Sequence, residues 1–429
     1  MNFPAKMIKV GTAVTAENKK EVWLINQYAN PPDVGTAGRH YYFACELAKQ
    51  GFSVALVTSS YNHLMRFPPK VSEKLTQEVR DGYRQVWVRV GQYANAHSTG
   101  RILNWIQFAW CIRKLPDILK NKPAAILCSS PSIFSFLGAR YLAKRTNARL
   151  IFEVRDIWPL TLIELGGLSR HNPFVMLLQC IEDYAYKSSE KVVSNLPNAV
   201  QHMVERGMDP RKFVWIPNGI TEDEVRKPEP LDENVFAQIP RDSFLVGYAG
   251  TLGKANAIEH LIEAAWLLRE KTEIKFVIVG NGRDKSNLLR LAQDRELNNV
   301  VFIDTIPKRQ IQSILSVFDV CFIGWRNERL YDYGIAANKL TDYLVSGKPV
   351  LHSYSGSNDL VKIYKAGVSV PAEEPAEIAR GVVTLYEMNE KERQRLGANG
   401  RRAAWKYHDY RELATKLATV LQGQEPAVE

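Results

Sequence analysis

One pattern recurs along most of this chain: a short apolar run, then a glycine-containing loop, then an amphipathic helical segment. Residues 22–25 form the first apolar run, and the loop 30–38, the helical segment 41–50 and the next run 54–57 follow it. Strands joined through helices in this way lie parallel, and the helices cover both faces of the sheet. The pattern therefore predicts an α/β fold built on parallel sheets.

The apolar runs fall into two series. The first continues at 86–90, 125–128, 150–154 and 191–194, and the second comprises 245–248, 275–279, 300–303, 320–323 and 350–352. An acidic, proline-rich segment at 221–240, typical of a linker or an irregular loop, lies between them, and 391–422 is expected to be helical. A chain of 429 residues is also too long for one ordinary domain. We therefore expect two Rossmann-like, doubly wound parallel-sheet domains that face a central cleft and bind ligands at the carboxyl ends of their strands.

The composition is that of a globular protein, with 45% apolar and 24% charged residues. No apolar run reaches the length of about 20 residues that a membrane span needs, and the first twenty residues lack the apolar core of a secretory signal. The five cysteines show no paired spacing. This usage predicts reduced thiols in the cytoplasm and no zinc site.

The net charge of +10 predicts an anionic partner. Most of the excess lies between residues 61 and 122, which contain eleven Lys or Arg and four Asp or Glu. Nucleic acid, a phosphorylated substrate or an anionic membrane surface are all consistent with it. The helical segment 101–115 adds Trp105, Phe108 and Trp110, which fit either a membrane interface or the packing of a core helix.

The segment 334–350 reads as a loop, a short helix, a Gly-Lys-Pro break and a strand. The N-terminus of a helix offers unpaired N–H groups and the positive end of a dipole to a diphosphate. Ala337 and Asn338 stand at this N-terminus, Lys339 adds a positive charge, and Asp342 is placed about one turn later to accept hydrogen bonds from ribose. We therefore expect an anionic nucleotide to bind here.

Three other loops follow strands and share the glycines that allow a backbone to approach a ligand closely. The candidate donor-binding residues in them are Gly35 and Gly38, then Gly250, Thr251 and Lys254, and finally Gly280 and Gly282. Ordinary turns between a strand and a helix also contain glycines, so this pattern alone leaves both interpretations open.

Two acids and an arginine end the run 150–154 and stand at the expected carboxyl edge of the first sheet. These candidate catalytic residues are Glu153, Arg155 and Asp156. Arg155 is suited to hold a phosphate, and Asp156 to orient or deprotonate an acceptor hydroxyl. A salt-bridged loop without catalytic function is the alternative.

The segments at 152–159, 247–256 and 334–350 resemble those of retaining glycosyltransferases of family 4, of the bacterial capsule, O-antigen and exopolysaccharide type. The resemblance implies the GT-B fold, an acceptor-binding domain at 1–216 and a nucleotide-sugar-binding domain at 217–404. It also implies that a C-terminal helix at about 405–429 crosses back onto the first domain. Two positions depart from the family: Gly334 replaces its first acid, and Thr251 replaces its arginine.

The expected activity is the transfer of a sugar from a nucleotide diphosphate donor to a hydroxyl of a lipid-linked or polysaccharide acceptor. We expect the donor to be UDP-linked and the transfer to retain the configuration of the sugar. No Asp-x-Asp motif is present, so we expect no metal and no cofactor, with helix dipoles and lysines in place of a cation. The expected location is cytoplasmic, peripheral on the inner face of the plasma membrane. The alternatives are a UDP-N-acetylglucosamine 2-epimerase-like enzyme, a non-catalytic partner of another transferase, and a nucleic-acid-binding protein, for which no motif is present.

Overall fold

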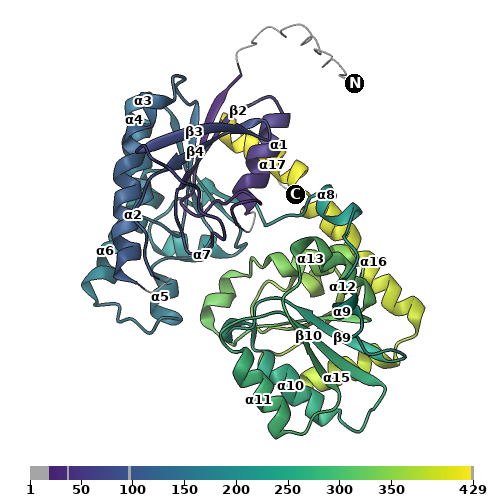
Figure 1. Cartoon of the computed structure of the whole chain (residues 1–429). Helices are drawn as coiled ribbons and strands as arrows, with labels where there is room; N and C mark the ends of the chain where they lie inside the picture. Colours follow the sequence, from purple (N-terminus) through teal and green to yellow (C-terminus); the bar gives the residue numbers. More distant parts are fainter. Residues whose placement is uncertain (1–18, 36–37, 95–97, 427–429) are drawn as a thin grey trace, which may run out of the picture.

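The computed structural model describes residues 19–35, 38–94 and 98–426, which form two β-sheets with helices on both faces (Figure 1). The first sheet has eight strands in the order β3-β4-β2-β1-β5-β6-β7-β8. The second has six strands, all parallel, in the order β11-β10-β9-β12-β13-β14. The predicted arrangement of two doubly wound α/β sheets is confirmed.

The strands of the first sheet are β1 (Glu21–Ile25), β2 (Ser53–Ser59), β3 (Leu75–Arg80), β4 (Tyr83–Val88), β5 (Ala125–Ser129), β6 (Arg149–Val154), β7 (Lys191–Ser194) and β8 (Phe213–Trp215). The helices between them are α1 (Arg39–Lys49), α2 (Thr99–Cys111), α3 (Leu115–Ile118), α4 (Ser135–Thr146), α5 (Leu160–Glu164), α6 (Pro173–Ser188) and α7 (Ala199–Glu205).

The strands of the second sheet are β9 (Phe244–Ala249), β10 (Ile274–Val279), β11 (Val300–Ile303), β12 (Val320–Gly324), β13 (Val350–Ser353) and β14 (Gly367–Val370). The helices of this half are α8 (Glu222–Arg226), α9 (Glu233–Phe236), α10 (Ile258–Leu267), α11 (Lys285–Asp294), α12 (Ile311–Val317), α13 (Asn338–Ser346), α14 (Leu360–Ile363), α15 (Pro375–Glu387), α16 (Glu390–Tyr407) and α17 (Tyr410–Gln422).

The predicted apolar runs all became strands because a parallel strand covered on both faces is apolar along its whole length. Every residue of β5 and β9, for example, is buried. Strands β3, β8 and β14 were not predicted. The expectation of parallel pairing is wrong at β3, which is antiparallel to β4 at the sheet edge. Only Leu75 of β3 is buried, so this strand has no apolar run to reveal it.

The aromatic residues of α2 take two different roles. Trp105 and Phe108, with 2% and 0% of their surfaces exposed, belong to the core of the first sheet. The membrane interpretation is therefore wrong for these two residues, because their rings pack inward. Trp110 is 65% exposed, and Leu103 and Ile106 of the same helix are exposed as well.

Two chain segments cross between the sheets and are bonded to each other. Ile220 donates its N–H to the carbonyl of His408 at 2.7 Å, and Tyr410 donates to the carbonyl of Ile220 at 3.1 Å. The segment 221–240, expected as a linker or irregular loop, contains the short helices α8 and α9. The helix expected over 391–422 is divided into α16 and α17, with Asp409 capping the second.

Helix α17 packs against the first sheet, although it is the last helix of the chain. Figure 1 shows it beside α1, whereas α16 runs along the second half. Leu413, Leu417 and Leu421 are buried in a cluster with Val22 and Val54 of the first sheet. The C-terminal residues therefore complete the core of the N-terminal half.

Replacing Leu417 tests this packing. Leu417 is fully buried, so Leu417→Ala leaves a cavity and is expected to lower the free energy of unfolding by about 2–5 kcal/mol. Chemical denaturation measures the change, and native-state hydrogen exchange should show the amides of β1 and β2 losing protection with those of α17. Lys416→Ala, on a partly exposed position of the same helix, is the control, with an expected change within about 0.5 kcal/mol. Equal losses in the two variants would contradict the assignment.

Candidate active site

Lys339 lies at the start of α13, among neutral polar and aromatic side chains. It is the second residue of α13, and Ala337, the N-cap of this helix, makes no side-chain capping hydrogen bond. The Lys339 ammonium donates to the hydroxyl of Tyr248 at 2.9 Å and to the side-chain oxygen of Asn256. Its Nζ also lies 4.7 Å from the centre of the Tyr248 ring and 5.6 Å from that of Trp325.

These partners are all neutral. Among the described residues, no carboxylate lies within ion-pair distance of Lys339. Burial lowers the pKa of Lys339 to about 7, because the ammonium has lost water without gaining an opposite charge. A desolvated lysine beside an uncapped helix N-terminus is a ready site for an anion, which restores the missing charge and accepts from the free N–H groups.

The glycine loops after β9 and β10 interlock beside this lysine. A Cβ on Gly250 would lie 3.5 Å from Cε of Lys339. Gly280 has a φ of +147°, and a Cβ there would come within 1.9 Å of the Gly250 carbonyl oxygen, while one on Gly282 would lie 2.1 Å from that of Leu252. No other residue fits at Gly280 or Gly282. The structure thus brings three predicted donor-binding glycines together at Lys339, and their contact with a donor stays a prediction.

The other predicted residues of this half surround the same loops. Thr251 is exposed, and its carbonyl accepts hydrogen bonds from Tyr248 at 2.7 Å and from Asn256 at 2.8 Å. The side chain of Lys254 is exposed, and Asn338 is exposed at the first position of α13. Their predicted roles toward a donor remain untested.

Asp342, expected to hold ribose, is engaged in an ion pair. Its two carboxylate oxygens lie 2.7 and 2.8 Å from Nζ of Lys308. Burial opposes the charge of Lys308, but Asp342 and Glu224 outweigh it and raise the pKa of this lysine. A ribose hydroxyl at Asp342 must share the carboxylate with Lys308, a partner that the sequence did not reveal.

Gly334, at the position of the missing family acid, has a packing role. Its φ is +99°, a conformation that favours glycine. A Cβ there would lie 2.5 Å from Cδ of Pro197, which belongs to the first half. The neighbouring Tyr333 likewise accepts a hydrogen bond from the backbone N–H of Asn198 at 3.0 Å. The contact between the two halves therefore excludes any side chain, and hence an acid, at Gly334.

Glu153 lies in the core, not on an open surface. It is fully buried and accepts from Arg39 Nε at 2.9 Å, and its other oxygen lies 2.5 Å from Nε2 of His40. Burial alone disfavours the carboxylate, but His40 and Arg39 hold the pKa of Glu153 well below its ordinary value. The enclosure argues against the catalytic role expected for Glu153, because a substrate cannot reach this side chain.

Arg155 and Asp156 are placed differently from Glu153. Asp156 is exposed to solvent, yet protein surrounds it closely enough that desolvation raises the pKa of its carboxyl, against the opposing charge of Arg155. The backbone N–H of Arg155 donates to Ser130 at 2.9 Å, while its buried Nε has no hydrogen-bond partner among the described residues. Both side chains remain candidates for acceptor binding, although the buried Nε of Arg155 is itself out of reach of an acceptor.

The loop before α1 contributes the remaining predicted residues. Gly35 forms an isolated β-bridge with Met65, and a Cβ on Gly35 would lie 2.8 Å from the carbonyl oxygen of Leu64. Gly38 has extended backbone and precedes the first residue of α1, with open space where a Cβ would be. Thr36 and Ala37, between these glycines, lie outside the described residues.

Comparison with known proteins connects this geometry to a family. The family model "Glycosyltransferase Family 4" matches residues 35–224, and the model "Glycosyl transferases group 1" matches residues 232–403. The chain is a GT-B glycosyltransferase of the family 4 type. Solved structures of similar fold, at 16% and 12% identity, are a sucrose-phosphate synthase from Thermosynechococcus elongatus and a trehalose-6-phosphate protein from E. coli bound with UDP-2-fluoro glucose. Each has a TM-score of 0.72. The match to the sucrose-phosphate synthase covers 94% of this glycosyltransferase and 99% of that chain. The match to the E. coli protein covers 95% and 100%, respectively.

Curated relatives match parts of this glycosyltransferase. It is 26% identical over 233 residues, 53% of its length, to the Escherichia coli (strain K12) protein named "Putative colanic acid biosynthesis glycosyl transferase WcaI". It is 22% identical over 274 residues, 63% of its length, to "Probable glycosyltransferase WbjE" of Pseudomonas aeruginosa. These matches span 56% and 65% of the two relatives. They favour the glycosyltransferase interpretation over the epimerase one.

Within the described residues, no helix is both long and apolar enough to cross a bilayer. The same residues contain no group of three or more His, Cys, Asp or Glu side chains placed to hold a metal ion.

The placement of Glu153 predicts a structural effect. Glu153→Gln removes the charge that neutralises the buried Arg39, so the free energy of unfolding should fall by about 3–5 kcal/mol. Because the pKa of Glu153 is lowered in the folded state, this stabilisation is present above the ordinary carboxyl pKa of about 4.3 and decreases as the pH falls below it. Denaturant titrations of both proteins between neutral and acidic pH measure the difference.

Asp156→Asn is the matched control, because it removes a neighbouring carboxylate that is solvent-exposed. Its expected stability change is within about 0.5 kcal/mol, and its turnover should fall. A stable Glu153→Gln protein that has lost turnover would restore the catalytic assignment of Glu153.

Proposed function

We propose that this glycosyltransferase transfers a sugar from a UDP-linked donor, with retention of configuration, to a hydroxyl of a lipid-linked or polysaccharide acceptor in bacterial surface glycan synthesis. The observation that carries the proposal is Lys339, which is desolvated at the start of α13 and forms no ion pair with any residue of the described ranges. Structures of similar fold include an Anabaena HepE protein in complex with UDP and glucose, at 12% identity and a TM-score of 0.63. The relatives named above supply the surface-glycan part of the proposal.

The donor diphosphate is the leaving group, and its negative charge grows as the bond to the sugar breaks. Lys339 and the N–H groups at the start of α13 are fixed beside this charge in a site with little water, where they stabilise it strongly. This arrangement does the work of a bound cation, so the proposed reaction is metal-independent. Asp342 holds the ribose in this proposal.

On the acceptor side, Arg155 and Asp156 orient the attacking hydroxyl. In a retaining reaction the acceptor approaches from the face that the diphosphate leaves, so an oxygen of the departing diphosphate accepts the hydroxyl proton. No protein side chain is then required as a strong base. Asp156 therefore acts in positioning, and its substitution lowers turnover without weakening donor binding.

The pH dependence of donor binding tests the role of Lys339. The ammonium loses its proton near pH 7 in the free protein, whereas a bound diphosphate raises its pKa, so binding takes up a proton. Affinity for a UDP-sugar should therefore fall as the pH rises above about 7, by up to about tenfold per pH unit. Isothermal titration calorimetry between pH 6 and about 9, in buffers of different ionisation enthalpy, measures both the affinity and the proton uptake. A UDP-sugar is preferable to UDP, because its phosphates do not titrate in this range.

Lys339→Met should weaken UDP-sugar binding at pH 6.5 by about 10- to 150-fold and abolish the pH dependence. Lys254→Met is the control, since Lys254 is exposed in the adjoining loop and should leave the slope unchanged. A Lys339→Met protein with the wild-type slope would show that another group takes up the proton.

The proposal includes an anionic membrane surface as partner. Leu103, Ile106 and Trp110 of α2 are exposed, and the neighbouring helices α4 and α6 add further exposed apolar side chains, namely Leu137, Tyr141, Met176, Leu177 and Tyr184. The guanidinium of Arg113 lies 4.5 Å from the centre of the Trp110 ring and 4.2 Å from that of Tyr141. An apolar face with cations among its aromatic rings suits the boundary between lipid headgroups and acyl chains.

Liposome co-sedimentation tests this partner. The protein should sediment with anionic vesicles and not with neutral ones, and binding should weaken as salt is raised, because basic residues contribute about 1 kcal/mol each near an anionic surface. Leu103→Glu/Ile106→Glu should abolish sedimentation. The control Ile363→Glu changes an exposed apolar residue of the second half and should leave it intact. Equal recovery of the wild type in the supernatant with both vesicle types would refute membrane docking.

A further inference from the structure

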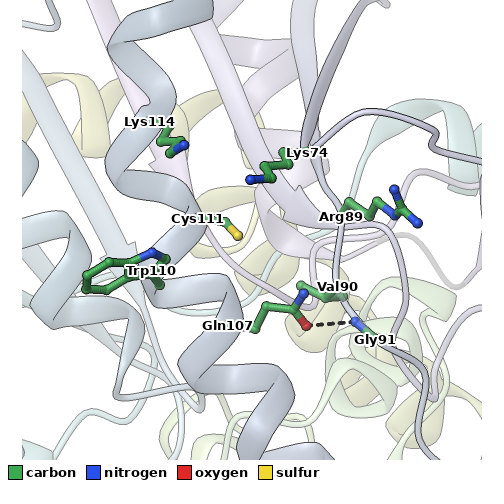
Figure 2. A pocket seen from close by; sticks show the side chains of 8 residues that line it. All are labelled: Lys74, Arg89, Val90, Gly91, Gln107, Trp110, Cys111 and Lys114. Atoms are coloured by element: carbon green, nitrogen blue, oxygen red, sulfur yellow. Dashed lines mark hydrogen bonds between the residues drawn. The ribbon is translucent and has the colours of Figure 1, made fainter.

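A pocket of about 390 Å³ lies on the flank of the first sheet, between the second half of α2 and the β3–β4 pair (Figure 2). Lys74 and Arg89 reach it from the strand side, and Lys114 reaches it from the end of the helix. Gln107, Trp110 and Cys111 of α2 line the same pocket. The pocket is distant in the fold from Lys339, which lies among the loops of the second sheet.

Backbone contacts fix the two walls relative to each other. Arg89 donates its N–H to the carbonyl of Lys74 at 3.0 Å, and its guanidinium donates to the carbonyl of Ser72 at 2.8 Å. On the helix side, the Gln107 side chain accepts from the N–H of Gly91 at 2.9 Å, as Figure 2 shows. The two walls that carry these cations are therefore tied together. Lys74 and Lys114 lie on the side of Cys111, whereas the Arg89 guanidinium is directed away from them (Figure 2).

No acid neutralises these cations. None of the residues that line the pocket is acidic, and Lys74, Arg89 and Lys114 form no ion pair with any described residue. The charges of Lys74 and Lys114 reach the Cys111 thiol. Burial raises the pKa of this thiol, and the two ammonium groups oppose the rise. Like charges gathered around one half-buried thiol repel each other, and a bound anion removes this repulsion.

The pocket adjoins a larger one near the carboxyl ends of β2 and β4. A second pocket, of about 670 Å³, shares Arg89 and Val90 with it and is also lined by Ser60 and Tyr61, which follow β2. Because β2 is parallel to both β4 and β1, the carboxyl ends of these three strands lie side by side, whereas β5 separates β1 from β6. The two pockets therefore adjoin each other at Arg89 and Val90, and the exposed Trp110 lines the first of them.

We propose that Lys74, Arg89 and Lys114 bind a diphosphate ester carried by the acceptor. This inference rests on the proposed transfer to an acceptor bound by the first half. A diphosphate diester carries two negative charges. The three cations outnumber these charges, so the pocket attracts such an anion. The acceptor's sugar then occupies the second pocket, and an attached chain leaves past Trp110 onto the exposed face of α2. The same chemistry fits a lipid diphosphate and a soluble one.

Alkylation of Cys111 provides a local measurement. Iodoacetamide modification, followed at each cysteine by peptide mass spectrometry, should slow about tenfold at Cys111 when inorganic pyrophosphate is present at about ten times its dissociation constant. Cys180, which is exposed elsewhere, should react at an unchanged rate and serves as an internal control. Experiments in saturating UDP-sugar keep pyrophosphate out of the donor site. Absence of protection at Cys111 would overturn the inference.

Charge variants locate the effect. The triple variant Lys74→Gln/Arg89→Gln/Lys114→Gln should lose at least about 100-fold in pyrophosphate affinity. The matched control Lys391→Gln/Arg395→Gln/Arg402→Gln changes the net charge equally on the exposed side of α16 and should retain protection. Equal weakening in both variants would mean a general effect of net charge and would overturn the site.

Two further arms separate the possible outcomes. Phosphatidylcholine vesicles containing a long-chain alkyl diphosphate should protect Cys111 at lower concentration than pyrophosphate if the ligand is a lipid, and at equal concentration if it is soluble. UDP-sugar binding is measured in parallel. Normal UDP-sugar binding without protection of Cys111 contradicts this inference alone, whereas protection without UDP-sugar binding contradicts the proposed function alone.

Discussion

The buried ion pair between Glu153 and Arg39 fixes the side chain that ties the first sheet to the segment crossing between the two sheets. Besides Glu153, Arg39 donates to the carbonyl of Pro217 at 2.7 Å and to the side chain of Asn218 at 3.1 Å, in the segment that crosses between the sheets. Asn218 in turn donates to the carbonyl of Ala336 at 2.6 Å, two residues before α13. A continuous chain of hydrogen bonds therefore runs from β6 to the helix that carries Lys339. Loss of either charge leaves the other buried without compensation, so this connection is sensitive to single substitutions.

The same connection explains why this chain departs from the family pattern it resembles. The loop before α13 is held from one side by Asn218 and from the other by Pro197, which leaves no room for a side chain at Gly334. Separately from Gly334, no acid among the described residues pairs with Lys339, so the charge of this desolvated lysine is not balanced within the site. A paired acid would compete with the diphosphate for Lys339, whereas neutral partners such as Tyr248 and Asn256 give way to it.

The sequence predicted the strands well because the parallel strands are buried on both faces, which makes them continuous apolar runs. That same burial hid the roles of individual acids. In a sheet covered on both faces, the apolar run of β6 does not show that Glu153 is enclosed in the core, whereas Asp156, two residues beyond the strand, is exposed. The partners of Lys339 were also invisible, because Tyr248 and Asn256 are more than eighty residues away in sequence. Lys74, Arg89 and Lys114 line one pocket because β3, which follows Lys74, pairs with β4. No apolar run revealed this edge strand.

The two cationic sites differ in how strongly salt screens their attraction for an anion, because one is desolvated and the other is exposed. Lys339 is a single charge with little access to water, so its attraction for an anion acts in a medium of low effective dielectric and is poorly screened by salt. The Lys74, Arg89 and Lys114 side chains are exposed, so each attracts an anion weakly, and their effect comes from their number. Salt therefore screens the flank pocket much more than the donor site. Raising the salt concentration should separate the two sites in one preparation, with the capture of an anionic acceptor lost before the binding of the nucleotide donor.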